Sequence, residues 1–225
     1  MFKGSSFWQI IQIGGVAMYI LLTCSVFSLG VILERIICYA RMARVKRQEF
    51  MAHLKELLEK GNTKKAMEIC KATTAPFASV ALAAFNLHGH SEKEIASAME
   101  RETALQTAYL EKYISFIGTI GSTAVYIGLL GTVLGIIRAF HDISASSAGG
   151  TSIVISGISE ALVCTAAGLC VAVPAVAAYN YFVKRIDNFV MDMELCASEL
   201  TDLMGHKKHK AESRSEEKIH VKTHE

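Results

Sequence analysis

A single carboxylate at the head of a long apolar stretch has the clearest chemical potential in this sequence. Glu160 is followed by 23 residues, 161–183, that carry no acidic or basic side chain. Charge inside a bilayer is costly, so an ionisable residue there usually faces protein or water and marks an ion path. Burial favours the neutral acid, whereas water or a cation holds the carboxylate ionised. A group near this balance can take up a proton on one side and release it on the other, which indicates proton conduction.

The depth of this acid in a membrane has two interpretations. If a span begins at the next residue, Glu160 lies at the membrane edge and is only hydrated. If the helix begins near Ile153, seven residues at about 1.5 Å each place the acid roughly 10 Å inside. Gly157 and Cys164 share its helix face. This narrow face suits a thin cavity or a contact with another helix.

Three stretches almost without charge provide the elements that must hold this acid. They cover residues 4–33, 113–137 and 143–183, and Glu160 is the one charged residue in the last of them. A transmembrane helix needs about 20 mostly apolar residues, and 52% of this chain is hydrophobic. We therefore expect an all-α membrane protein. Its three transmembrane helices are predicted at 13–34, 113–137 and 153–183.

The distribution of Lys and Arg predicts the orientation of these spans. Outside them, one basic residue precedes the first span, 13 lie between the first and second, one lies between the second and third, and eight follow the third. Positive residues mark the cytoplasmic side, and those after the first span favour a retained anchor over a cleaved signal peptide. The N-terminus 1–12 and the loop 138–152 are predicted to be periplasmic. The loop 35–112, the helix 184–204 and the tail 205–225 are predicted to be cytoplasmic.

The cytoplasmic loop has the pattern of a helical bundle. Residues 42–60 show helical periodicity that ends at Gly61 and Asn62. A second short helix follows, and Pro76 suits the first turn of a third.

Two further helices are predicted to join the spans to the cytoplasmic region. Ser91 and Glu94 have capping-box spacing, and no breaker follows them, so one long helix is expected from 91 to about 138. The third span is expected to continue to about 204. The charged tail 205–225 lacks an apolar period, so we expect it to be disordered.

The second span carries a stripe of small residues. They occur at Gly118, Gly121, Ala124, Gly128, Gly131 and Gly135, in steps of three and four that keep them on one helix face. Glycines allow helix backbones to approach closely in a membrane, so this stripe predicts tight helix packing. Thr132 lies one position off the stripe and, taken alone, gives no functional signal.

The third span has a packing face of its own. Thr165 lies about 140° around the helix from Glu160 and shares its side with Ala161, Gly168 and Ala172. This environment indicates a small packing residue. Pro174 removes one backbone hydrogen bond, and we expect it to kink the helix.

Nothing in the sequence favours an enzyme or a metal protein. The six cysteines have no CxxC or zinc spacing, and we expect buried thiols in place of disulfides. Neither a Ser/His pair nor a phosphate-binding loop is evident. We therefore expect no catalytic activity, no cofactor, no metal and no nucleic-acid partner.

Two blocks carry a family resemblance. "GTIGSTAVYIGLLGTVLGI" at 118–136 and "ISGISEALVCTAAGLCVAVPAVAAYN" at 155–180 resemble the MotA/TolQ/ExbB proton-channel family, most closely its ExbB and TolQ branch. The resemblance covers residues 10–205, including the three spans and the large cytoplasmic loop. The chain departs from the family pattern at Val125, where proline is usual, and at Leu134, where tryptophan is usual.

The resemblance implies a bacterial inner-membrane subunit that forms a homopentamer. In the family, the second and third spans line a pore around the single spans of two ExbD or TolR chains, and proton flow drives TonB or TolA. Matched by motif, Glu160 is the pore acid, and Thr132 and Thr165 are the polar pore threonines. A membrane aspartate of the partner would carry the proton, with Glu160 shaping its path.

Two other functions compete with this one. A structural membrane scaffold without an ion path would explain the glycines but not the acid. A motor stator of the MotA or gliding type would retain the proton path and change the partner.

Overall fold

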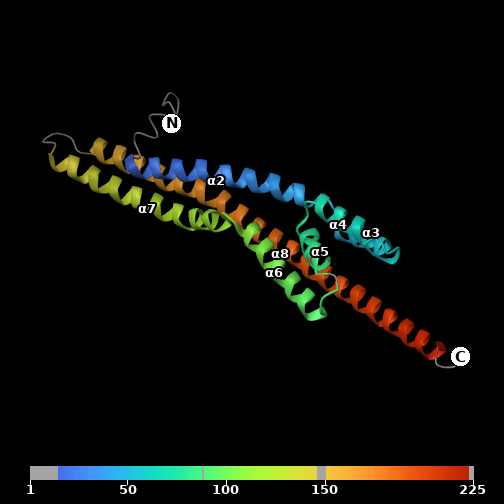
Figure 1. Ribbon diagram of the computed structural model, residues 1–225. Helices are drawn as coiled ribbons and strands as arrows, with labels where there is room; N and C mark the ends of the chain where they lie inside the picture. The colour runs from blue at the N-terminus through green and yellow to red at the C-terminus, as the bar shows by residue number, and fades with distance from the viewer. Residues whose placement is uncertain (1–14, 88, 146–150, 223–225) are drawn as a thin grey trace. The chain divides into compact units, whose positions relative to one another are not determined.

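The computed structural model describes residues 15–87, 89–145 and 151–222, and every regular element in these ranges is an α-helix (Figure 1). This confirms the all-α fold class. Three helical stretches are long and apolar enough to cross a membrane: Gly15–Glu59, Glu92–Ser144 and Val154–Met204. Their number agrees with the three spans predicted from the sequence. The helices are α2 (Gly15–Met42), α3 (Arg47–Glu59), α4 (Thr63–Ala72), α5 (Pro76–Asn86), α6 (Glu92–Glu111), α7 (Ile114–Ala145) and α8 (Thr151–Lys222).

The chain divides into two compact units. The first comprises Met1–Ile36 and Lys112–Val183, and the second comprises Ile37–Glu111 and Lys184–Glu225. The first unit therefore holds most of α2, all of α7 and the first half of α8. The second holds α3 to α6 with the remainders of α2 and α8.

In the first unit, α7 and α8 run antiparallel at very short range (Figure 1). A Cβ added to Gly121 would lie 2.8 Å from Val176 Cγ2, and one added to Gly135 would lie 2.8 Å from Ala161 Cβ. Real Cβ atoms do not approach this closely, so glycine is required at these contacts. The absent side chains allow the backbones to touch, which provides van der Waals packing where lipid gives little hydrophobic drive.

Helix α2 contacts both α7 and α8 in this unit. Leu21 forms a buried cluster with Ala124 of α7 and Ala172 of α8. Met18 forms a second cluster with Cys164. The first span therefore closes one side of the α7–α8 pair.

The second unit has an ordinary hydrophobic core. The rings of Phe50 and Phe77 lie 5.1 Å apart between centroids, and Tyr39 donates its hydroxyl hydrogen to the carbonyl of Leu110 at 2.6 Å. Around these contacts lie buried apolar residues of α4, α5, α6 and α8: Ala66, Ala78, Val80, Ala81, Ala84, Met99, Met193 and Leu200.

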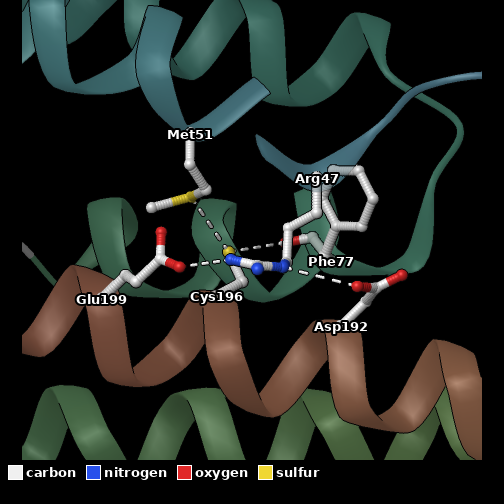
Figure 2. Close-up of polar contacts among 6 residues, drawn as sticks. All are labelled: Arg47, Met51, Phe77, Asp192, Cys196 and Glu199. Atoms are coloured by element: carbon white, nitrogen blue, oxygen red, sulfur yellow. Dashed lines mark hydrogen bonds and ion pairs between the residues drawn. The ribbon is translucent and has the colours of Figure 1, made fainter. Parts of the chain in front are cut away.

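An ion-pair network joins α3 to α8 in this unit (Figure 2). The guanidinium of Arg47 lies between two carboxylates of α8: its Nε is 3.4 Å from Asp192 Oδ1, and its Nη1 donates to Glu199. Between these acids, Cys196 is buried, with its Sγ 3.5 Å from Met51 Sδ. The charged groups thus border a sulfur-rich apolar contact.

Several local predictions are confirmed. Ser91 N donates to Glu94 Oε2 at 2.9 Å and Glu94 N donates to Ser91 Oγ at 3.3 Å, which is the reciprocal pair of a capping box. Pro76 occupies the first turn of α5. Gly61, just after α3, has φ +74°, a conformation that glycine adopts without strain.

The predicted continuous helix from 91 to 138 is wrong at one point. α6 ends at Glu111, α7 begins at Ile114, and Tyr113 has φ 68°. This left-handed conformation is unfavourable for a bulky residue. Two cations lie over its ring, Arg35 at 5.5 Å and Lys112 at 4.8 Å from the centroid. These contacts help to hold a break that no Gly or Pro marks in the sequence.

The C-terminal segment also differs from expectation. α8 continues as helix to Lys222, whereas the charge pattern predicts disorder over 205–225. The segment extends a helix that already exists, so it needs no new nucleus, and its Lys, Glu and Ala residues are good helix formers. The predicted periplasmic N-terminus 1–12, residues 146–150 of the loop and residues 223–225 lie outside the described residues.

Candidate functional site

Glu160 lies in the third turn of α8, on the wall of a cavity in the first unit. The helix begins at Thr151, so the acid is nine residues, about 14 Å, from its start. This early start is what the deeper of the two interpretations requires. The side chain is half-buried, and Ser156 Oγ donates to its Oε1 at 3.4 Å.

The cavity has a volume of about 410 Å³ and is formed by all three helices of the unit. α2 contributes Val16 and Ala17. Small residues of α7 and α8 make up much of the remaining wall: Gly131, Gly135, Ala139, Gly157, Ala161 and Cys164. A cavity of this volume can hold several water molecules if polar groups line it.

Two further ionisable residues line the same cavity. Arg138 and Asp142, both on α7, share it with Glu160. Arg138 is exposed, and a Cβ on Gly15 would lie 3.1 Å from its Nη1, so the guanidinium reaches the first residue of α2. The site is therefore a group of two acids and one base. In the sequence alone, Glu160 looks like an isolated acid.

The sequence did contain a signal for Arg138. It is the single basic residue between the second and third predicted spans, and antiparallel helices joined by a short loop bring the two sides of that loop together. The spacing in sequence, 22 residues from Arg138 to Glu160, conceals this proximity.

The two threonines do not line the cavity, although each is next in sequence to a residue that does. Thr132 is 8% exposed and donates to the carbonyl of Leu129 at 2.6 Å. Thr165 is half-buried and donates to the carbonyl of Gly128 at 3.3 Å, across the helix pair. Because Gly131 contacts Cys164, the adjacent Thr132 and Thr165 lie at the same level of the two helices. Neither threonine is among the residues that line the cavity of Glu160.

The remaining glycines of interest lie on the same helix contact. A Cβ on Gly168 would lie 2.7 Å from the carbonyl oxygen of Ala124, and one on Gly131 would lie 2.8 Å from Cys164 Cβ. Gly128 meets Gly168 directly. Pro174 lies within α8, which continues as helix through it. The kink expected there stays a prediction.

The fold and the site define a class. Over the described residues, this is a multi-pass α-helical membrane protein in which three apolar helices enclose a cavity that holds a carboxylate.

Comparison with known proteins identifies the family. The profile of the MotA/TolQ/ExbB proton channel family matches residues 69–195, more than half of the chain. The chain belongs to this family. The matched region includes α7 and the part of α8 that bears Glu160.

Similarity to individual proteins named TolQ and ExbB agrees with this family assignment. The chain is 36% identical over 115 residues to the Tol-Pal system protein TolQ of Pseudomonas aeruginosa, covering 51% of this chain and 50% of the relative. It is 38% identical over 98 residues to the biopolymer transport protein ExbB of Pseudomonas putida, covering 44% and 30%. A putative ExbB homologue of Methanothermobacter thermautotrophicus is 26% identical over 187 residues, covering 83% and 66%. The chain thus spans about half the length of the TolQ relative and less than a third of the Pseudomonas putida ExbB.

Proposed function

We propose that this chain is an ExbB- or TolQ-like subunit of an inner-membrane proton channel, acting in transport and not as an enzyme. The observation that carries the proposal is the position of Glu160, half-buried in a helix-lined cavity beside Arg138 and Asp142. Water in such a cavity can deliver a proton to the carboxylate. The family to which the chain belongs supports the choice of proton as the ion.

The orientation follows from the basic residues. The N-terminus and the loop that follows α7 are proposed to be periplasmic, and the C-terminus cytoplasmic, because Lys and Arg concentrate between the first and second spans and after the third. In this orientation the Glu160 cavity lies toward the periplasm, the side from which protons enter an energised cell.

The partners are proposed by analogy with the relatives. We propose a homopentamer around an ExbD- or TolR-like single-span protein, coupled to a TonB- or TolA-like protein that acts on the outer membrane. Many large apolar side chains on the three long helices are exposed in the single chain, including Tyr126, Leu130 and Leu162. These residues are available to lipid and to neighbouring subunits.

A scaffold without an ion path is the second candidate. The glycine contacts between α7 and α8 are compatible with a scaffold, because close helix packing requires no ion path. It leaves the carboxylate in the cavity unexplained. A third candidate is a motor stator of the MotA or gliding type, in which this chain would keep the proton path but act with a different partner.

The test is proton flux through the chain reconstituted in liposomes with its single-span partner. Glu160→Gln keeps the size of the side chain and removes its charge, so we expect flux to fall at least about tenfold while the assembled complex keeps its mass. Glu194→Gln, the same change at an exposed position of α8, is the matched control. Full flux in the Glu160 variant would favour the scaffold. A neighbouring gene for a short single-span protein with a membrane Asp would favour the channel.

A further inference from the structure

A second cavity lies in the other unit, among basic residues. It has a volume of about 320 Å³ and is formed by the end of α2, the α2–α3 connection, α3, α5 and α8. Lys46, Arg47 and Arg185 line it, with Asp192 as its one carboxylate within the described residues. Phe77 and Phe189 supply apolar walls.

Arg185 is held in place in this cavity. Its guanidinium lies over the ring of Phe189, 5.4 Å from the centroid. Phe189 in turn meets Tyr39 edge-on at 5.8 Å, and Tyr39 is fixed by its hydrogen bond to the carbonyl of Leu110. A preorganised guanidinium loses little freedom when it binds a ligand.

The hydrogen-bonding capacity of Arg185 is not fully used. Among the described residues its Nε is buried and has no hydrogen-bond partner. A partly desolvated guanidinium without a carboxylate partner is costly, and an anion bound to its outer nitrogens would offset this cost.

The three cations are not equivalent. Arg47 is neutralised by Asp192 and Glu199. Lys46 pairs with Glu49 at 3.6 Å, but both side chains are mostly exposed, and such surface pairs contribute little. Arg185 and Lys46 are therefore the charges that can engage a ligand.

We propose that this cavity binds a phosphate-bearing anion, and that in the cell this is the headgroup of an acidic phospholipid of the cytoplasmic leaflet. Arg185 follows the third apolar stretch by two residues, and Lys46 lies 13 residues after the first. Arg185 is thus close in sequence to the cytoplasmic membrane boundary of the proposed orientation, and Lys46 lies farther from it on the same side. Basic pockets beside membrane helices on this side suit acidic headgroups, and guanidinium groups bind phosphate in a bidentate manner.

The experiment uses the full chain purified in detergent. Native mass spectrometry would count retained phosphatidylglycerol and phosphatidylcholine with the same acyl chains. A second arm would add inorganic phosphate alone and follow its phosphorus NMR line width. We compare the unchanged chain with Arg185→Gln and Arg185→Lys. Lys184→Gln is the control, because Lys184 is exposed, next in sequence, and carries the same charge.

The unchanged chain and the Lys184 variant should retain phosphatidylglycerol in preference to phosphatidylcholine. Arg185→Gln should reduce that preference about tenfold, as expected for a charged hydrogen bond, and Arg185→Lys should restore only part of it. Binding of inorganic phosphate without lipid preference would support the anion site and overturn the lipid headgroup. Equal retention by the Arg185 and Lys184 variants would overturn the site itself. None of these readouts depends on proton flux, so they stand apart from the proposed channel.

Discussion

Gly128 of α7 and Gly168 of α8 face each other with no side chain between them. A Cβ on Gly128 would lie 3.2 Å from the Cα of Gly168, and one on Gly168 would lie 3.1 Å from the Cα of Gly128. The hydroxyl of Thr165 reaches the carbonyl of Gly128 across the same contact. Glycine here sets the distance between the two helices, and with it the shape of the cavity one turn away.

Gly168→Val should therefore separate α7 from α8. Its Cβ would meet the carbonyl oxygen of Ala124, which is backbone and cannot rotate away. Overpacking of this kind costs about 1–3 kcal/mol, which thermal unfolding in detergent would detect. Gly30→Ala is the control, since nothing lies within 4 Å of its added Cβ and alanine favours helix. A variant at Gly168 as stable as that control would contradict the close contact.

Arg47→Gln should destabilise the second unit. It leaves Asp192 and Glu199 without their shared cation. We expect a loss of about 1–2 kcal/mol, below the roughly 3–5 kcal/mol of a fully buried pair, because both acids are partly exposed. Lys60→Gln breaks the exposed pair with Glu56 and should cost much less, because surface ion pairs contribute little to stability. Chemical unfolding of both variants gives the comparison, and equal losses would show that the Arg47 network contributes no more than a surface pair.

The stability of the second unit should fall in alkali. Burial raises the pKa of the Cys196 thiol from 9.0 to about 12 and that of Cys70 to about 11. Above pH 9 the unfolded chain releases these protons while the folded chain keeps them. Rising pH therefore stabilises the unfolded state relative to the folded state. The free energy of unfolding should drop by about 1.4 kcal/mol per pH unit and per thiol above pH 9 until the folded thiols titrate.

Unfolding midpoints between pH 8 and 10.5 would measure this slope. Cys196→Ala should reduce the slope, whatever its effect on absolute stability, because one titrating thiol is removed. An unchanged slope in that variant would assign the pH dependence to other groups.

Arg138→Gln should slow proton flux without disrupting assembly. The guanidinium shares the cavity of Glu160, and removing its charge changes the potential that a proton meets on entering. We expect a reduction of several-fold in liposome flux, smaller than for Glu160→Gln. Arg101→Gln, at an exposed position of α6, is the control. Equal flux in both arginine variants would show that Arg138 has no part in the path.

The spans and their packing faces could be predicted from the sequence because both depend on local pattern. Stretches of about 20 apolar residues identify membrane helices, and steps of three and four place Gly121, Gly128 and Gly135 on one face. The capping box at Ser91 was equally local. The break at Tyr113 was not, because its left-handed backbone is held in part by Arg35, 78 residues earlier in the chain.

The site was predictable in part for the same reason. Glu160 stands out against its apolar surroundings, whereas the presence of Arg138 and Asp142 beside it depends on the register of two antiparallel helices. The helical wheel correctly separates Thr165 from Glu160. It cannot show that Thr132 lies at the same level on the neighbouring helix.

The glycine contact also restricts where hydration can run. A water molecule is about as large as a methyl group, and none fits between the backbones where Gly128 meets Gly168 or where Gly121 meets Val176. Under the proposed function, a proton arriving at Glu160 thus has no inward exit between α7 and α8 of its own chain. A route onward from Glu160 would then run along other faces of these helices, and we expect a single subunit to conduct few protons until another chain covers those faces.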